Sequence, residues 1–288
     1  VCGFSQTKSI NKSEPLVQAK PEEVFMSQER LDRIGKMCQQ AVDDTVIPGA
    51  VVLVARHGKI VYYEAFGKAD YESGREMKTN DIFRIASQSK AITATAVMML
   101  WEEGKFRLDD PISKYIPEFK NAKVLDSLYS DGTYTSHPAD KEITIRHLLT
   151  HTSGIGYGMI DADARFKTIY HDAGVTDVFT TKNVTIEESV KILAKLPLHH
   201  NPGEKFTYSE GLDVLGYFVE IMSGMPLDEF FRTRIFMPLQ MNDTWFYLPK
   251  DKHGRLVPVQ TKENNEWVKY PKTFYDPDYP VKGKKTFF

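Results

Sequence analysis

The sequence predicts an α/β fold, in which an α+β layer carries a mostly helical insertion. Two β-rich runs at 50–55 and 60–66 are joined by Arg56-His57-Gly58-Lys59, which predicts a hairpin. The apolar stretch 91–101 predicts a buried helix. After residue 109, short helical segments alternate with loops rich in Gly, Pro and Asp. The 288 residues are enough to bury a large core in one elaborate domain or in two.

Composition narrows the classes of function. Hydrophobic residues make up 41% and charged residues 26% of the chain, as in ordinary globular proteins. The formal net charge of -2 gives no support for nucleic acid or an anionic membrane as partner. No apolar run reaches about 18 residues, so no transmembrane segment is predicted. The two cysteines, Cys2 and Cys38, cannot form a disulfide framework, and Cys38 is expected to be a small buried hydrophobe.

The first residues, 1–27, predict a signal remnant followed by a polar tether. The chain begins without an initiator methionine, and the small residues Gly3 and Ser5 precede a possible cleavage site before Gln6. These features predict an exported protein, periplasmic or on the outer surface of a bacterium, and a processing scar is the alternative. Lipidation of Cys2 is a further alternative, although the valine before it is bulkier than usual.

The predicted α/β layer spans 28–108. An amphipathic helix at 28–44 opens it, with an apolar face made of Leu31, Ile34, Met37, Cys38 and Ala41. After the hairpin, a strand-like run at 81–85 leads into the apolar helix. That helix is expected to end at Glu103-Gly104, where glycine suits a C-cap, and to place Trp101 in the core.

The predicted insertion spans 109–245, with short helices at 143–150, 186–196, 212–223 and 227–236. The last range, 246–288, is predicted to begin a return to the α/β layer. Two strong strands and a short third are too few to cover two helices, and the chain stops without a closing element. The sequence therefore predicts an incomplete sheet in a chain that is cut short at its C-terminus.

The four residues Ser87-Gln88-Ser89-Lys90 carry the strongest candidate chemistry. If a helix starts at or just before Ser87, then Ser87 and Lys90 lie three residues apart on one face. A hydroxyl beside an amine that burial keeps neutral is a nucleophile beside a base. The helix N-terminus adds positive potential where an oxyanion would form. A serine helix cap beside a solvated lysine is the alternative explanation of so short a pattern.

A second candidate, Tyr208, follows a Pro202-Gly203 turn and precedes a helix expected from about Gly211. A tyrosine near a neutral lysine can lose or relay a proton, so it can serve as general base or general acid. A packed tyrosine at the rim of that helix is the alternative.

Other polar residues are expected to be structural. Asp161 and Asp163 are expected to be solvated acids of a loop. His199-His200 has no partner at metal-ligand spacing, so no metal site is predicted. The triplet Ser130-Asp131-Gly132 is expected to form a turn.

Several short motifs, in a constant order along the chain, resemble those of one serine hydrolase family. This family holds class C β-lactamases, D-alanyl-D-alanine carboxypeptidases and β-lactamase-like esterases. The matching stretches lie within about residues 28–248 and are Pro48-Gly49-Ala50, FRIASQSK at 83–90, GKFRLDDP at 104–111, HLLTHTSG at 147–154, Pro202-Gly203 with Tyr208-Ser209, and MPLQM at 237–241.

The resemblance implies a β-lactamase/transpeptidase-like fold and a serine acyl hydrolase that needs no metal or organic cofactor. It implies that Ser87 is the nucleophile that becomes acylated, with its backbone N–H as half of an oxyanion hole. Lys90 would keep Ser87 and Tyr208 deprotonated or accept the serine's proton. Tyr208 would act as base in acylation and as acid toward the leaving group. His151 is expected near the site, as a structural loop residue or a substrate contact.

Two departures from the family pattern narrow the implied substrate, which is a small-molecule ester, amide or peptide. Glu210 stands where the family's asparagine helps to hold a substrate amide, and a carboxylate there repels the carboxylate of penicillins. This favours an esterase over a D-Ala-D-Ala carboxypeptidase, D-aminopeptidase or β-lactamase. The family's third motif, Lys-Thr-Gly or His-x-Gly, is absent, in agreement with the predicted truncation. A non-catalytic member that binds acyl or peptidoglycan-like ligands is the alternative from another class.

Overall fold

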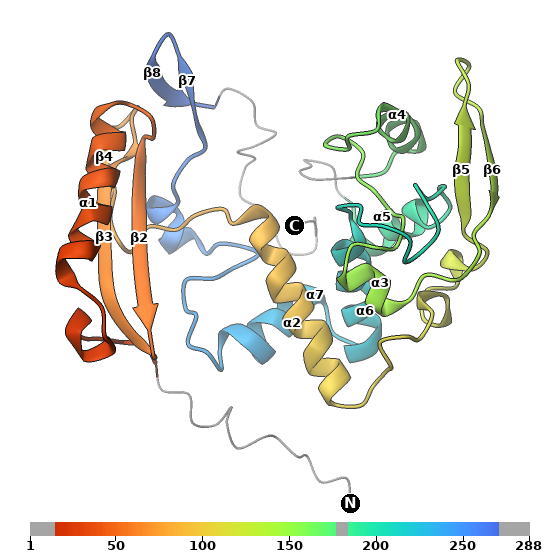
Figure 1. The fold of residues 1–288 in the computed structure, drawn as a ribbon, viewed down its shortest axis with the longest axis horizontal. Helices are drawn as coiled ribbons and strands as arrows, with labels where there is room; N and C mark the ends of the chain where they lie inside the picture. Colours follow the sequence, from red (N-terminus) through yellow and green to blue (C-terminus); the bar gives the residue numbers. More distant parts are fainter. Residues whose placement is uncertain (1–14, 177–183, 271–288) are drawn as a thin grey trace, which may run out of the picture. The chain divides into compact units, whose positions relative to one another are not determined.

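A computed structural model describes residues 15–176 and 184–270 of the protein. The described residues form two compact units, a sheet unit (15–84 and 249–270) and a helical unit (85–176 and 184–248) (Figure 1). The predicted boundary between 108 and 109 falls inside the helical unit, because the helix after Ser87 packs on helices of the insertion. The predicted signal remnant with Cys2, and the last part of the predicted return to the α/β layer, lie outside the described residues.

The sheet unit is built on a four-stranded sheet with the order β1-β3-β2, in which β4 also pairs with β3 (Figure 1). The predicted hairpin is confirmed as the antiparallel pair β2 (Gly49–Arg56) and β3 (Lys59–Asp70). β4 (Arg75–Glu76) pairs antiparallel with the end of β3. β1 (Val17–Gln18) runs parallel to β3, so the end of the predicted tether is part of the sheet.

Helix α1 (Gln28–Asp43) packs on β3 and confirms the predicted amphipathic helix. Ser27 caps it, because the Ser27 hydroxyl accepts a hydrogen bond from the Arg30 N–H at 3.3 Å. Cys38 is buried as predicted, whereas Met37 is 65% exposed. Consecutive residues of a helix point about 100° apart, so Met37 falls at the edge of the apolar stripe that holds Cys38.

Residues 249–270 add the 3₁₀ helix η7 (Lys250–Arg255) and a second hairpin to the sheet unit. The hairpin joins β7 (Gln260–Glu263) to β8 (Glu266–Lys269) through Asn264-Asn265, which both have positive φ. The sequence analysis did not predict it. The strand predicted at 81–85 forms only an isolated bridge between Ile82 and Leu256.

The helical unit is centred on α6 (Gly211–Ser223), which packs against α2 (Ser89–Glu102) and α7 (Leu227–Phe231). The buried helix predicted after Ser87 is thus confirmed. Trp101 was predicted in the core but is 44% exposed, because it lies in the last turn of α2, away from the core stripe that ends at Leu100.

Shorter elements complete the core around α6. α3 (Ile145–Leu149) and α5 (Ile186–Leu193) pack on α6 and begin at the capping residues Thr144 and Thr185. The single helix predicted at 227–236 is α7 followed by a π-helical turn, η6 (Arg232–Phe236). The sequence analysis missed α4 (Ala164–Ala173), which begins at the capping residue Asp163.

The helical unit also carries a hairpin of β5 (Lys123–Leu128) and β6 (Tyr134–Pro138), which was not predicted (Figure 1). The turn predicted at Ser130-Asp131-Gly132 is confirmed as its tip. The remaining elements within residues 15–176 and 184–270 are four 3₁₀ turns: η2 (Pro21–Val24), η3 (Ala86–Gln88), η4 (Ile112–Lys114) and η5 (Pro117–Phe119). Among the described residues, no helix is long and apolar enough to cross a membrane.

Candidate active site

Ser87 lies in the 3₁₀ turn η3, two residues before α2 begins at Ser89. The helix therefore starts close to the predicted position, and Ser87 is exposed near its positive N-terminal end. The residue before it, Ala86, has φ 42°, a left-handed conformation that costs a non-glycine residue about 1 kcal/mol or more. The backbone next to Ser87 is thus held in a strained conformation.

Two side chains meet the Ser87 hydroxyl. The Tyr208 hydroxyl lies 2.8 Å from Ser87 Oγ, and Lys90 Nζ donates to the same oxygen at 3.2 Å. Lys90 reaches it from one turn along the chain, whereas Tyr208 comes from the segment before α6, 121 residues away. All three residues belong to the helical unit. The structure therefore brings together the three residues that were predicted to be catalytic.

Aromatic rings surround this cluster. The ring of Tyr157 stacks on that of Tyr208 at 5.4 Å and 29°, and Lys90 Nζ lies 5.4 Å and 5.1 Å from the centroids of these two rings. Tyr157 was not singled out from the sequence. Its neighbours, Gly156 and Gly158, are the only local signal, since glycines flank a residue whose backbone must approach other chain segments closely.

His151 also packs against Tyr208. The two ring centroids are 4.9 Å apart, and the exposed Phe206 ring meets His151 at 5.7 Å. His151 Nδ1 accepts a hydrogen bond from the backbone N–H of Ser209 at 3.2 Å, and the His151 carbonyl accepts one from the Thr207 N–H at 2.8 Å. Burial lowers the pKa of His151, and the positive charge of Lys90 lowers it further. His151 thus holds the Tyr208 segment in place as a neutral ring.

Glu210 is the predicted site residue that the structure does not expose. It precedes the first residue of α6, and it is 2% exposed. Its backbone N–H donates to the carbonyl of Gly156 at 3.1 Å, which ties the segment of Tyr208 to that of Tyr157. Its predicted contact with a substrate stays a prediction.

The prediction that Asp161 is a solvated acid is wrong. Its side chain is 6% exposed and pairs with His199 Nε2 at 3.0 Å. Asp163 lies at the surface end of this loop, where it caps α4 and pairs with Arg165 at 2.7 Å. The error arises because the partner of Asp161 lies 38 residues further along the chain.

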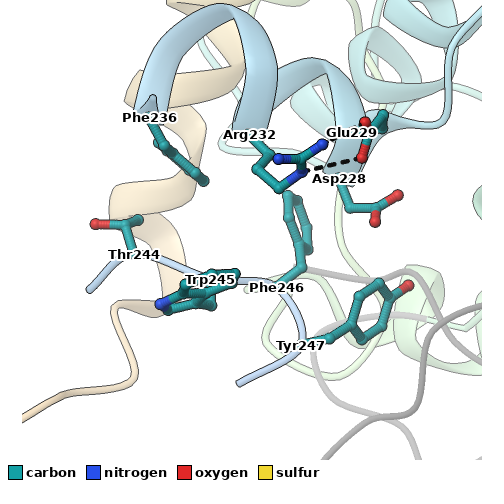
Figure 2. A pocket seen from close by; sticks show the side chains of 8 residues that line it. All are labelled: Asp228, Glu229, Arg232, Phe236, Thr244, Trp245, Phe246 and Tyr247. Atoms are coloured by element: carbon teal, nitrogen blue, oxygen red, sulfur yellow. Dashed lines mark hydrogen bonds and ion pairs between the residues drawn. The ribbon is translucent and has the colours of Figure 1, made fainter. Parts of the chain in front are cut away.

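The helical unit also contains a cavity of about 150 Å³ between α7, η6 and residues 244–247 (Figure 2). Figure 2 shows Arg232 in this cavity with its guanidinium paired to Glu229, at 2.6 and 3.1 Å. The pairing offsets the charge of Arg232, and the rings of Phe236, Trp245, Phe246 and Tyr247 also line the cavity. Ser87 is not among the lining residues, so the cavity is separate from the serine cluster.

The part of the chain that the structure describes contains no set of side chains that could bind a metal ion. No group of three or more His, Cys, Asp or Glu side chains lies close enough to hold an ion there. The chemistry available at Ser87 is instead that of a hydroxyl flanked by two proton carriers, Lys90 and Tyr208.

A serine that follows a strained residue and precedes a buried helix, with a lysine and a tyrosine on its hydroxyl, defines a protein of the β-lactamase/transpeptidase fold class. The chain belongs to the Beta-lactamase family, whose model matches residues 34–283. The predicted family and fold are thereby confirmed.

Similarity to individual proteins points in the same direction. Esterase EstB of Burkholderia gladioli is 38% identical over 74% of this chain and 51% of that protein. Lovastatin esterase of Penicillium rubens is 32% identical over 78% of this chain and 56% of that protein. The solved structure of EstCE1, described as a hydrolase with promiscuous acyltransferase activity, is 33% identical with a TM-score of 0.72, over 84% of this chain and 59% of that one. The chain spans about half the length of the curated relatives it matches.

Proposed function

We propose that this protein is a serine acyl hydrolase, which cleaves small-molecule esters through an acyl-Ser87 intermediate. The observation that carries the proposal is the convergence of the Tyr208 hydroxyl and Lys90 Nζ on Ser87 Oγ, at 2.8 and 3.2 Å. Two similar proteins named as esterases support ester over amide as the bond cleaved.

The proposed reaction has two halves. In the first, Ser87 Oγ attacks the ester carbonyl carbon while its proton passes to Tyr208 or Lys90, and the carbonyl oxygen becomes an oxyanion. The C–O bond to the alcohol then breaks, and the leaving alcohol takes the proton back. In the second half, water attacks acyl-Ser87 by the same proton route, which releases the carboxylic acid and restores the serine.

Two features of the chain favour attack by Ser87. The N-terminal end of α2, a helix of 14 residues, places positive potential near the oxyanion. The faces of Tyr157 and Tyr208 lie against Lys90 Nζ, where such contacts stabilise a positive charge by about 0.5–2 kcal/mol.

Labelling with a fluorophosphonate tests the proposal directly. The wild-type chain is expected to gain one adduct on Ser87 by intact mass and to hydrolyse p-nitrophenyl butyrate. Ser87→Ala should lose both, while Lys90→Ala and Tyr208→Phe should slow both by about 10²-fold or more. Ser89→Ala is the matched control, since it removes a hydroxyl from the same motif and should keep both.

The outcome that overturns the proposal is the absence of an adduct on Ser87 in a folded wild-type chain. Faster turnover of a cephalosporin than of p-nitrophenyl esters would instead assign the protein to β-lactam hydrolysis. The predicted export to the periplasm or outer surface rests on residues 1–6 alone, and fractionation of expressing cells tests it.

A further inference from the structure

We propose that the buried Asp161–His199 pair positions the Tyr157 ring, and through it Tyr208 and Lys90, for acylation of Ser87. Asp161 and His199 are positioning residues in this account, because neither contacts the Ser87 hydroxyl. The inference rests on the proposed function, since its purpose is to hold the groups that activate Ser87.

The Asp161 carboxylate organises the loop that carries Tyr157. Its Oδ2 accepts a hydrogen bond from the Tyr157 backbone N–H at 2.9 Å and meets His199 Nε2 at 3.0 Å. Its Oδ1 accepts one from the Asp163 N–H at 2.8 Å. The side chain of aspartate has two oxygens that accept hydrogen bonds, whereas an amide has one, so asparagine at this position cannot satisfy all three donors.

His199 is fixed from two sides, so the position of its donor is fixed as well. Its ring stacks on the fully buried Phe166 of α4, with 3.3 Å between centroids and 13° between planes. Its backbone N–H donates to the carbonyl of Gly154 at 2.7 Å. Burial lowers the pKa of His199 and the charge of Asp161 raises it in part, and a neutral ring with its proton on Nε2 donates to Asp161.

The backbone at Gly156, between the Asp161–His199 pair and Tyr157, is closely packed and hydrogen-bonded. A Cβ on Gly156 would lie 2.3 Å from His199 Nε2 and 2.4 Å from Asp161 Oδ2, so the backbone lies directly on the pair. The Gly156 N–H donates to the buried Tyr170 hydroxyl at 3.2 Å. The Gly156 carbonyl accepts from the Glu210 N–H, two residues beyond Tyr208. A change at Asp161 therefore moves backbone that is bonded to both tyrosine segments.

The final link is the Tyr157 ring. It stacks on Tyr208, and both rings face Lys90 Nζ. Because Lys90 and Tyr208 share Ser87 Oγ, a shift of Tyr157 changes the distances that proton transfer depends on. Displacements of about 1 Å at such distances can cost about 10²-fold in rate.

Paired variants test this inference against a structural role. Asp161→Asn and His199→Phe are expected to lower the rate constant of fluorophosphonate labelling and kcat for p-nitrophenyl butyrate about tenfold, with KM nearly unchanged. His199→Gln keeps a side-chain N–H donor for Asp161 and should retain more of the rate than His199→Phe, which keeps only the stacked ring.

The chain supplies a matched control. Asp126 and His137 form a second Asp–His pair, at 2.6 Å, on the exposed β5–β6 hairpin. Asp126→Asn and His137→Gln should leave the labelling rate within about twofold of wild type. Thermal unfolding of every variant, measured alongside, shows whether a slower rate accompanies loss of fold.

A readout that needs no turnover separates this inference from the proposed function. In protein labelled with 3-fluorotyrosine, the ¹⁹F resonances assigned to Tyr157 and Tyr208 should shift in Asp161→Asn and His199→Phe but not in the Asp126 or His137 variants. Unshifted resonances, or labelling rates equal to wild type in Asp161→Asn, overturn the inference. Shifted resonances in a chain that never labels at Ser87 would overturn the proposed function alone.

Discussion

The rings of Tyr157 and Tyr208 stack with their centroids 5.4 Å apart, although 51 residues separate them in the chain. Tyr208 shares the Ser87 hydroxyl with Lys90, and Lys90 Nζ faces both rings. The stack therefore fixes one wall of the cluster that would activate Ser87.

We expect Tyr157→Leu to slow labelling of Ser87 about tenfold, because stacked aromatic pairs contribute about 0.5–1.5 kcal/mol beyond their buried area. Tyr157→Phe keeps the ring and should lose less. Labelling rates with a fluorophosphonate, compared between the two variants, check this. Equal losses in both would assign the effect to the Tyr157 hydroxyl instead of the stack.

Gly154→Ala should destabilise the protein by about 3 kcal/mol or more and abolish labelling of Ser87. Gly154 has φ 85°, and a Cβ there would lie 2.3 Å from the backbone carbonyl oxygen of His200. Gly174→Ala is the control: its φ of 74° is similar, but no atom lies within 4 Å of the added Cβ. It should cost only about 1 kcal/mol, the penalty of the backbone conformation. Chemical denaturation of both variants measures the difference, and equal losses would contradict the close packing at Gly154.

The protein should lose stability as the pH falls from about 7 toward 5. Burial lowers the pKa values of His147, His151 and His199 in the folded protein. The unfolded chain then binds more protons over this window, so the free energy of unfolding falls as pH drops below the usual histidine pKa of about 6.5. Each histidine contributes at most about 1.4 kcal/mol per pH unit.

Thermal unfolding between pH 7.5 and 5 measures this dependence. His151→Gln should make the unfolding midpoint depend less steeply on pH, because it removes one group that takes up a proton on unfolding. His171→Gln, which removes a ring with 88% of its side-chain surface exposed, should leave the curve unchanged. A midpoint that stays constant or rises toward pH 5 in the wild type would contradict the burial of these rings.

Glu210→Gln should keep ester hydrolysis within about threefold of wild type and should not create turnover of penicillins. The side chain is 2% exposed, so its charge does not face a ligand bound at the surface, and glutamine keeps its shape and one acceptor oxygen. Steady-state kinetics with p-nitrophenyl butyrate and benzylpenicillin check this. A tenfold change in KM, or a gain of penicillin hydrolysis, would show that position 210 contacts the substrate as the sequence analysis predicted.

Contacts of the site between residues that are close in the sequence could be predicted from the sequence. Ser87 and Lys90 share one turn, so their meeting follows from helix geometry once the helix is placed. Tyr208 lies 121 residues from Ser87, and only the ordered family motifs connected the two. The hairpin of β2 and β3 and the helices α1, α2 and α6 were equally visible, since each combines a clear apolar pattern with turn or capping residues.

The rest depends on contacts that no local pattern encodes. Tyr157 in a Gly-Ile-Gly-Tyr-Gly run gives no sign that its ring will stack on Tyr208. Asp161 lies in an Asp-Ala-Asp stretch that is typical of exposed loops. It can be buried because two backbone N–H groups and His199, from a distant segment, hydrogen-bond to its carboxyl group. Two hairpins were missed because their strands carry polar residues that mask the alternation of a sheet.

At Ala86, the residue before the proposed nucleophile Ser87, the left-handed backbone conformation affects stability and activity in opposite ways. Glycine at this position would relieve strain of about 1 kcal/mol and stabilise the fold, yet it would also widen the range of orientations open to Ser87. Alanine has less backbone freedom than glycine, so it narrows the orientations open to Ser87 at the expense of stability. Selection for heat resistance would therefore favour glycine at position 86, whereas selection for a faster reaction would favour alanine.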